Sequence, residues 1–248
     1  MPLKKSDVPP ISEIDVDAMV ARYAHERERR LRKEGARAYV QPSGDKLPDY
    51  SIDPHTDPAP RGPSEREIDV VLLGAGFGGV LAAYYLTGQG VEDFVLLDTA
   101  GDFGGVWYWN RYPGVQCDND SYCYLPLLEE TGFVPSKKFA DGWEIQGYIR
   151  QIAEQFGFAD KGVFHTQVTS LVWEDGQGRW LVESNRGDRI RSRFVVMANG
   201  VLNMPKLPAL EGIDRFRGKL FHTARWDYDY TGGGWDNPVL DRLADKTV

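Results

Sequence analysis

Three glycines with the spacing G-x-G-x-x-G, Gly74, Gly76 and Gly79, are the first residues here whose pattern could do chemistry. They follow the apolar run IDVVLL and precede the helix-like stretch VLAAYYLTGQG, which Gly90 closes. At such a strand-to-helix turn, the first glycine allows a tight turn, the second lets a pyrophosphate approach, and the third seats the helix. The unpaired N–H groups at the helix start favour an anion. The pattern predicts a dinucleotide site, with a purely structural turn as the alternative.

An acidic residue, Asp98, ends the next apolar run, FVLLD, 24 residues after Gly74. A carboxylate at this place accepts hydrogen bonds from the ribose hydroxyls of an adenosine and disfavours a 2′-phosphate. We therefore expect this first site to hold FAD or NAD rather than NADP.

The segment GGVWYWNRYPGVQCD, residues 104–118, follows this site and is unusually aromatic. Its side chains Trp107, Tyr108 and Trp109 could cover the sheet, or they could stack on a planar ring system. The chemistry of the residues alone leaves both readings open.

A third motif, FRGKLFHTARWD at residues 216–227, has the pattern F-x-G-x-x-x-H-x-x-x-W followed by Asp227. A lone histidine is most often a structural residue, but His222 stands within several constrained positions at fixed spacing. The remaining histidines lack such a context, and we expect them to be surface or structural residues: His25, His55 and His165.

Together, GAGFGG, GGVWYWNRYPGVQCD and FRGKLFHTARWD resemble the N-terminal part of the Baeyer–Villiger monooxygenases, which are class B flavoprotein monooxygenases. The resemblance covers residues 68–248. In relatives, a second G-x-G-x-x-G, the active-site arginine and most of the NADPH-binding domain lie beyond the position of Val248. We therefore expect a truncated, split or incomplete chain that needs the remainder of the same enzyme for activity.

The resemblance also implies roles for single residues. Asp118 would position the arginine that stabilises the oxygenated flavin, although a structural aspartate with no catalytic duty is the alternative. His222 would support cofactor positioning and domain movement, and a direct catalytic role is equally open. Gln116, Cys117 and Asp118 match a stretch near the nicotinamide of bound NADPH. The residues implied to bind a cofactor are Gly74, Gly76, Gly78, Gly79, Asp98, Val106, Trp107, Tyr108, Trp109, Gln116, Cys117, Asp118, Tyr124 and Val168.

The implied activity uses FAD, NADPH and O2 to insert one oxygen atom next to a ketone carbonyl, which gives an ester or a lactone. Asp227, in place of the commoner proline, and the extended loop after it resemble relatives that act on bulky cyclic ketones. The alternatives are an N- or S-oxygenating flavin monooxygenase and a catalytically incomplete FAD-binding fragment. A disulfide reductase is disfavoured because Cys117 and Cys123 have the spacing C-x5-C instead of C-x4-C.

Composition excludes several other classes. The 248 residues are 42% hydrophobic and 27% charged, which suits a globular chain with a sizeable core. The net charge of −8 argues against a nucleic-acid partner. We expect no membrane partner and a cytoplasmic location, because no apolar run reaches about 18 residues and the N-terminus lacks a signal-peptide core. Two cysteines are too few for a disulfide scaffold, and no metal site is expected.

We expect an α/β fold with a Rossmann-like, doubly wound parallel sheet and an antiparallel β-meander, apparently truncated. The apolar patterns predict a helix between an Asp141 N-cap and Gly157. They also predict three meander strands at Val163–Trp173, Arg179–Ser184 and Arg189–Ala198.

Three regions are expected along the chain. Residues 1–67 form an extension with one amphipathic helix, which begins near Ser12 and Asp15 and ends at Gly35, and a proline-rich linker. Residues 68–206 form the first part of an FAD-binding domain. Residues 207–248 hold the signature loop and the start of an NADPH-binding domain.

Overall fold

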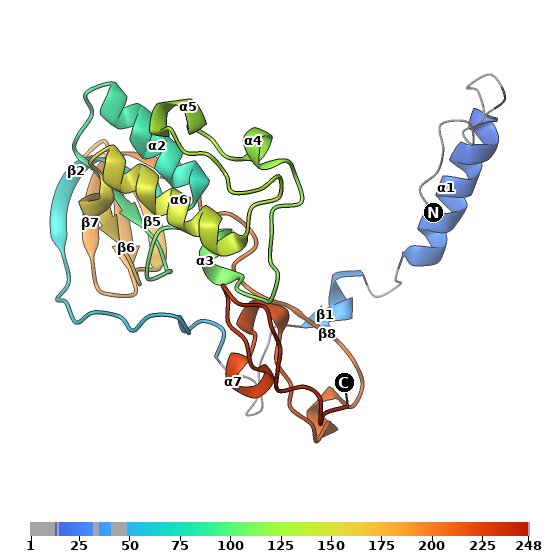
Figure 1. Ribbon diagram of the computed structural model, residues 1–248. Helices are drawn as coiled ribbons and strands as arrows, with labels where there is room; N and C mark the ends of the chain where they lie inside the picture. The colour runs from blue at the N-terminus through green and yellow to red at the C-terminus, as the bar shows by residue number, and fades with distance from the viewer. Residues whose placement is uncertain (1–12, 14, 32–34, 41–48, 248) are drawn as a thin grey trace. The chain divides into compact units, whose positions relative to one another are not determined.

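The computed structural model describes residues 13, 15–31, 35–40 and 49–247 (Figure 1). The chain divides into two compact units, one of residues 1–41 with 206–216 and the other of residues 42–205 with 217–248. These units do not coincide with the expected boundaries after residues 67 and 206, and the division into functional domains stays a prediction. Among the described residues, no helix is long and apolar enough to cross a membrane.

The first unit contains helix α1 (Val16–Arg30) and a small two-stranded sheet. Asp15 is the N-cap of α1 and accepts a hydrogen bond from the Ala18 N–H at 2.9 Å, whereas Ser12 lies outside the described residues. The helix ends at Arg30 and not at Gly35, because Leu31 already has an extended backbone. After the 3-10 turn η3 (Gly35–Ala38), strand β1 (Tyr39–Val40) pairs with β8 (Leu207–Pro208), which is followed by the 3-10 turn η5 (Ile213–Arg215).

The second unit is built on a six-stranded sheet with the order β4-β3-β2-β7-β6-β5. Strand β2 is parallel to β3 and β7, β3 is parallel to β4, and β5, β6 and β7 form an antiparallel meander. This confirms the predicted parallel sheet with a meander that returns to it. The strands are β2 (Glu65–Leu73), β3 (Phe94–Leu97), β4 (Gly162–Val163), β5 (Val168–Glu174), β6 (Arg179–Ser184) and β7 (Arg189–Met197).

Helices α2 (Phe77–Gly88) and α6 (Gly142–Gln155) cover one face of this sheet and lie in front of it in Figure 1. Leu72 and Leu96 point into the same fully buried cluster as Ile149 of α6. Alternate strand residues point to the opposite face, where Val71 and Val95 join a second cluster. The short helices of this unit are α3 (Val106–Trp109), α4 (Ser121–Tyr124), α5 (Leu128–Thr131) and α7 (Tyr228–Thr231), and its 3-10 turns are η4 (Ala159–Lys161) and η6 (Thr223–Arg225).

The predicted limits of α6 are confirmed, since Asp141 is its N-cap residue and Gly157 follows its end with φ +74°. The predicted strand Val163–Trp173 is wrong, because this segment forms two strands, β4 and β5. Between them, His165 has a left-handed backbone with φ +49°. The Thr166 N–H donates to the carbonyl of Asp98 at 2.8 Å, so the chain is held against the loop after β3 instead of continuing as a strand.

A strap of residues 49–64 joins the sheet without helices or strands of its own. Arg61 forms a two-pronged ion pair with the buried carboxylate of Asp188, with N–O distances of 2.6 and 2.7 Å. The same carboxylate accepts hydrogen bonds from the Ser184 hydroxyl and the Ser64 N–H. These partners, Arg61 first, lower the pKa of Asp188 below the ordinary value for an aspartate. Asp188 therefore fastens the strap to the turn between β6 and β7.

Replacing this carboxylate should destabilise the fold at neutral pH. We expect Asp188→Asn to lower the free energy of unfolding by about 2–3 kcal/mol at pH 7, since it removes charge-assisted hydrogen bonds from a buried site. Because the folded-state pKa is depressed, the stabilisation is present above the unfolded pKa of about 4 and disappears as the pH falls through the folded value. Urea unfolding at pH 7 and pH 3 measures both effects. Asp57→Asn, at an exposed position of the strap, is the control. Equal stability of the two variants at pH 7 would contradict this account.

Candidate functional site

A cavity of about 680 Å³ lies where the parallel strands end. The register pairs Leu73 with Leu97 and with Met197, so the ends of β2, β3 and β7 are level. The turn after β2, the loop after β3 and the segment after β7 all line the cavity. Ligands of open α/β sheets bind at this carboxyl edge.

The glycines of the turn allow backbones to approach closely. A Cβ atom on Gly79 would lie 1.9 Å from the carbonyl oxygen of Gly74, so only glycine lets α2 pack on the turn. A Cβ atom on Gly105 would lie 2.8 Å from the Cα atom of Gly76. At this point, the turn after β2 and the loop after β3 therefore meet through the backbones of Gly76 and Gly105. Gly74, Gly76 and Gly78 line the cavity, and Gly79 seats the helix behind it.

Asp98 lies between these two loops and lines the cavity. Its carboxylate accepts hydrogen bonds from the N–H groups of Ala75 at 2.6 Å and Ala100 at 2.8 Å. Burial raises the pKa of this carboxyl, although its hydrogen bonds oppose the rise. A carboxylate has about four acceptor positions, and hydrogen bonds from the Thr99 side chain and backbone compete for those that Ala75 and Ala100 leave. Sequence reasoning missed the role in holding the glycine turn, and the predicted ribose contact stays a prediction.

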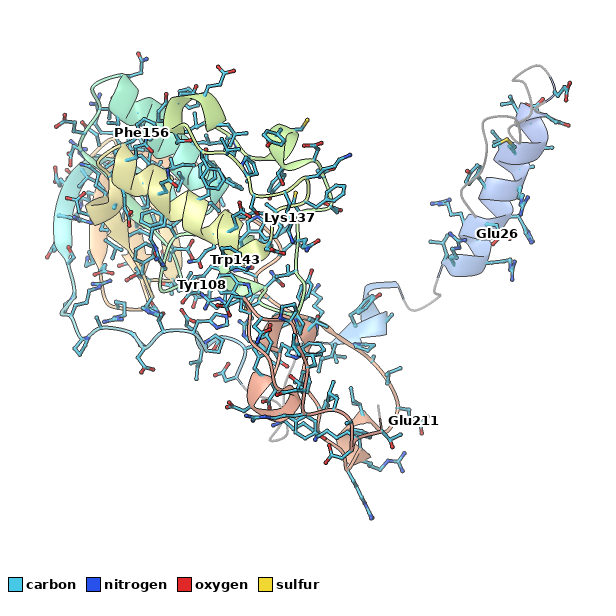
Figure 2. The ribbon with its side chains drawn as sticks, viewed as in Figure 1. Glu26, Tyr108, Lys137, Trp143, Phe156 and Glu211 are labelled. Atoms are coloured by element: carbon cyan, nitrogen blue, oxygen red, sulfur yellow. The ribbon has the colours of Figure 1, made fainter. Side chains whose placement is uncertain are left out.

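The aromatic residues of α3 point in different directions. Trp107 and Trp109 line the cavity together with Val106 and Tyr124, and the Trp107 Nε1 donates to the Tyr124 hydroxyl at 2.9 Å. Tyr108 lies inside the second unit but is not part of the cavity lining (Figure 2). Trp107 shares a buried cluster with Leu72 and Leu96 of the sheet, so it covers the sheet as well as lining the cavity, whereas Tyr108 joins a separate cluster with Ala100 and Trp109. Stacking of these rings on a planar ring system stays a prediction.

The hydroxyl of Tyr108 belongs to a buried polar cluster that the sequence did not reveal. It donates to the carboxylate of Asp53 at 2.5 Å and lies 2.8 Å from the Thr56 hydroxyl. Burial, with the Asp53 hydrogen bond next, raises the pKa of Tyr108 to about 12. Burial also lowers the pKa of His55 to about 4, so this imidazole is neutral at pH 7. The strap was expected to be a linker, and a single Asp in a proline-rich stretch carries no signal of such a contact.

Gln116, Cys117 and Asp118 do not line the cavity. Gln116 donates its side-chain amide to Asp141 at 2.9 Å, and Cys117 is buried, which raises the pKa of its thiol. Asp118 is exposed, and among the described residues its carboxylate accepts a single hydrogen bond, from Asn119 at 3.4 Å. The proposed roles of these three residues towards NADPH and catalysis stay predictions.

His222 lies outside the cavity lining and caps the 3-10 turn η6. Its Nδ1 accepts a hydrogen bond from the Ala224 N–H at 3.0 Å, which requires a neutral ring nitrogen. Burial, followed by the nearby Arg225, lowers the pKa of His222 and favours that form. Asp227 is the N-cap of α7, accepting from the Tyr230 N–H, and also pairs with Lys219. An acid at this position therefore starts a helix through a side-chain bond that proline cannot form.

The structure thus brings some predicted site residues together and leaves others apart. The cavity also has a polar side that sequence reasoning missed, because short polar residues at strand ends form no recognisable spacing. Predicted residues in the cavity lining are Gly74, Gly76, Gly78, Asp98, Val106, Trp107, Trp109, Tyr124 and Val168; missed polar residues include Thr99, Thr166, Gln167, Thr169, Ser170, Asn199 and Asn203.

Comparisons with known proteins agree with this geometry. Residues 72–129 match the model of an NAD(P)-binding Rossmann-like domain. A Baeyer-Villiger monooxygenase of Streptomyces coelicolor is 48% identical over 228 residues, which are 92% of this chain and 38% of that protein. The polycyclic ketone monooxygenase of Thermothelomyces thermophila has a similar structure, with a TM-score of 0.84 and 36% identity over 93% of this chain and 40% of that one. A solved complex of OTEMO with FAD and NADP has a TM-score of 0.60 and 30% identity over 67% of this chain and 33% of that one.

The chain spans about two fifths of the length of the curated relatives that it matches. Within that span, the sequence is similar to that of the curated relatives, and the fold is similar to that of the solved monooxygenase. Over nearly its whole length, the chain is therefore homologous to a portion of proteins named Baeyer–Villiger monooxygenase.

Proposed function

We propose that the chain forms the FAD-binding part of a Baeyer–Villiger monooxygenase. Such an enzyme uses NADPH and O2 to insert one oxygen atom next to a ketone carbonyl and releases an ester or a lactone. The observation that carries the proposal is the cavity in which the glycine turn, Asp98 and the indoles of Trp107 and Trp109 meet. Relatives named Baeyer–Villiger monooxygenase favour this reaction over N- or S-oxygenation.

The residues of the cavity fit the parts of FAD. Helix α2 begins after Gly76 without a side-chain cap, so its first N–H groups are free to bind a pyrophosphate. Asp98 lines the cavity, where its carboxylate would accept hydrogen bonds from ribose hydroxyls in competition with Thr99. Trp107 and Trp109 offer flat apolar surfaces for an aromatic ring system. The volume of about 680 Å³ is within the range for cofactor sites.

The chemistry divides between the cofactor and the protein. FAD, when bound, supplies the electron and oxygen transfer that side chains cannot perform. The chain binds the pyrophosphate, orients the adenosine and excludes water from the ring through its aromatic wall. We further propose that Gln116, Cys117 and Asp118 face NADPH. His222 acts indirectly in this proposal, because it lies outside the cavity lining and its Nδ1 accepts the Ala224 N–H.

A further part of the protein should complete the site. Strand β6 pairs with β7 only as far as Ser192, and beyond this point Phe194 and Met197 are 58% and 69% exposed. An apolar strand end of this kind is normally covered. We propose that the remainder of the enzyme covers it and brings the rest of the catalytic residues. A bulky cyclic ketone as substrate and a cytoplasmic location stay predictions.

The visible absorption spectrum of the purified chain tests the proposal. After incubation with FAD and gel filtration, we expect flavin bands to stay with the protein, because the turn, Asp98 and the aromatic wall lie within these residues. NADPH should bleach the bands in the complete enzyme and leave them unchanged in the 248-residue chain. A protein fraction without flavin bands would refute FAD binding by this cavity.

Asp98→Asn should weaken FAD binding roughly 10- to 100-fold, since a charge-assisted hydrogen bond is worth about 1.5–3 kcal/mol. Titration of flavin fluorescence measures the dissociation constant, and thermal unfolding of the apoprotein shows whether the glycine turn survives. Asp160→Asn, at an exposed position of η4, is the matched control. If both variants bind FAD equally, Asp98 does not contact the cofactor.

Asp118→Ala should leave folding and FAD binding unchanged, because its carboxylate is exposed and nearly free of contacts. In the complete enzyme, we expect slower flavin reduction or slower product formation, measured by stopped-flow absorbance and product analysis. Unchanged turnover would remove Asp118 from the mechanism.

A further inference from the structure

Arg225 is a buried cation for which the proposed function gives no role. It lies in the 3-10 turn η6, and only 9% of its surface is exposed. Its guanidinium donates to the carbonyls of Trp109 and Tyr50, each at 3.4 Å, and to that of Ala224 at 2.9 Å. The guanidinium carbon also lies 4.9 Å from the centre of the Trp109 ring and 5.7 Å from that of Tyr50. Arg225 thus holds Trp109 by both its backbone and its indole.

Ion pairing does not explain this position. Among the described residues, no carboxylate lies within 4.0 Å of the Arg225 guanidinium, and its Nε has no hydrogen-bond partner. Burial lowers the pKa of Arg225, although an arginine remains charged at neutral pH. Burying a guanidinium with incomplete partners costs free energy. Its contacts to the Ala224 carbonyl, Trp109 and Tyr50, together with the attraction of the Asp53 charge, must offset that cost.

Trp109 needs an external contact to fix its orientation. Helix α3 is a single turn, and its N-cap, Gly105, makes no side-chain capping bond. One isolated turn is not stable on its own. The Tyr108 ring contacts the Trp109 indole edge-on at 5.4 Å, and the Arg225 guanidinium stacks on it. Because Trp109 lines the cavity, the angle of this indole shapes the wall that a flavin would meet.

We propose that Arg225 is a positioning residue for the cofactor cavity. Arg225 contacts both the carbonyl and the indole ring of Trp109 and fixes the orientation of this side chain; we call these two contacts the clamp. Through them, the motif at residues 216–227 is linked to the aromatic wall. The identity of the ligand rests on the proposed function, since FAD is the group that this wall would contact. The clamp itself is a property of the chain and can be measured without the cofactor.

Arg111 offers a matched control in the same region. It is also a largely buried arginine stacked on aromatic rings, 4.7 Å from the centre of Tyr108 and 4.3 Å from that of Trp235. Its Nε donates to the carbonyl of Tyr108 at 2.9 Å. Neither ring lines the cavity. Removing either arginine removes one buried positive charge, but only Arg225 touches a residue of the wall.

Fluorine NMR of the chain labelled with fluorotryptophan tests the clamp without FAD. The Trp109 resonance is identified by its loss in Trp109→Phe. We expect Arg225→Met to shift this resonance by more than its line width and Arg111→Met to leave it in place. Arg225→Lys keeps a positive charge but lacks the planar group that stacks on the indole, so it should also shift the Trp109 resonance. This variant replaces Arg225→Met in the experiment if Arg225→Met does not fold. An unmoved Trp109 resonance in a folded Arg225 variant overturns the proposal.

FAD affinity supplies the second measurement. Arg225→Met should weaken FAD binding about tenfold, whereas Arg111→Met should change it less than about threefold. If Arg225→Met and Arg111→Met weaken FAD binding equally, the loss of affinity comes from the loss of a positive charge, and the proposal is wrong. The proposal is also wrong if Arg225→Lys binds FAD as tightly as the unaltered chain. If the unaltered chain binds no FAD, the proposed function fails, and the Trp109 resonance alone decides whether Arg225 holds the indole.

Discussion

The close contact between two glycine backbones is the constraint on which the rest of this structure depends. The turn after β2 and the loop after β3 meet at Gly76 and Gly105, and the Gly104 N–H donates to the Ala75 carbonyl at 3.0 Å. Any side chain at this meeting point would push the loops apart. The contact sets the distance between the start of α2 and the aromatic helix α3, so it determines the width of the cavity. Asp98 then fixes the two loops by accepting one N–H from each side.

A second consequence is that the wall of the cavity depends on chain segments far away in sequence. Once α3 is placed against the glycine turn, its own single turn cannot fix its side chains. Tyr108 is held from behind by Asp53 of the strap, whose side chain is only 3% exposed. The same strap supplies the Tyr50 carbonyl that Arg225 uses. The strap and the part of the motif at residues 217–227 therefore support the cavity from outside, and neither lines it.

Sequence patterns predicted those elements of the fold whose limits depend on residues close in sequence. The glycine spacing placed the turn and α2, and the interval from Asp141 to Gly157 placed α6. The break between β4 and β5 could not be predicted, because it arises from hydrogen bonds to the distant carbonyls of Asp98 and Ala100. The resemblance to the Baeyer–Villiger monooxygenases, and not the spacing alone, indicated that the aromatic segment lies at the site. It could not show that Tyr108 points away, because that depends on a carboxylate from a segment without any motif.

The strap also has a consequence for the order in which the chain assembles. Arg61 is separated from Asp188 by 127 residues, and the Tyr50 carbonyl is separated from Arg225 by 175. On a ribosome that adds about 5–20 residues per second, Arg61 emerges roughly 6–25 s before Asp188, and Tyr50 emerges roughly 9–35 s before Arg225. Contacts of such long range also form slowly in refolding, since the loop between them must close first. The segment made early is thus among the last to dock, and until then its buried polar groups remain in water.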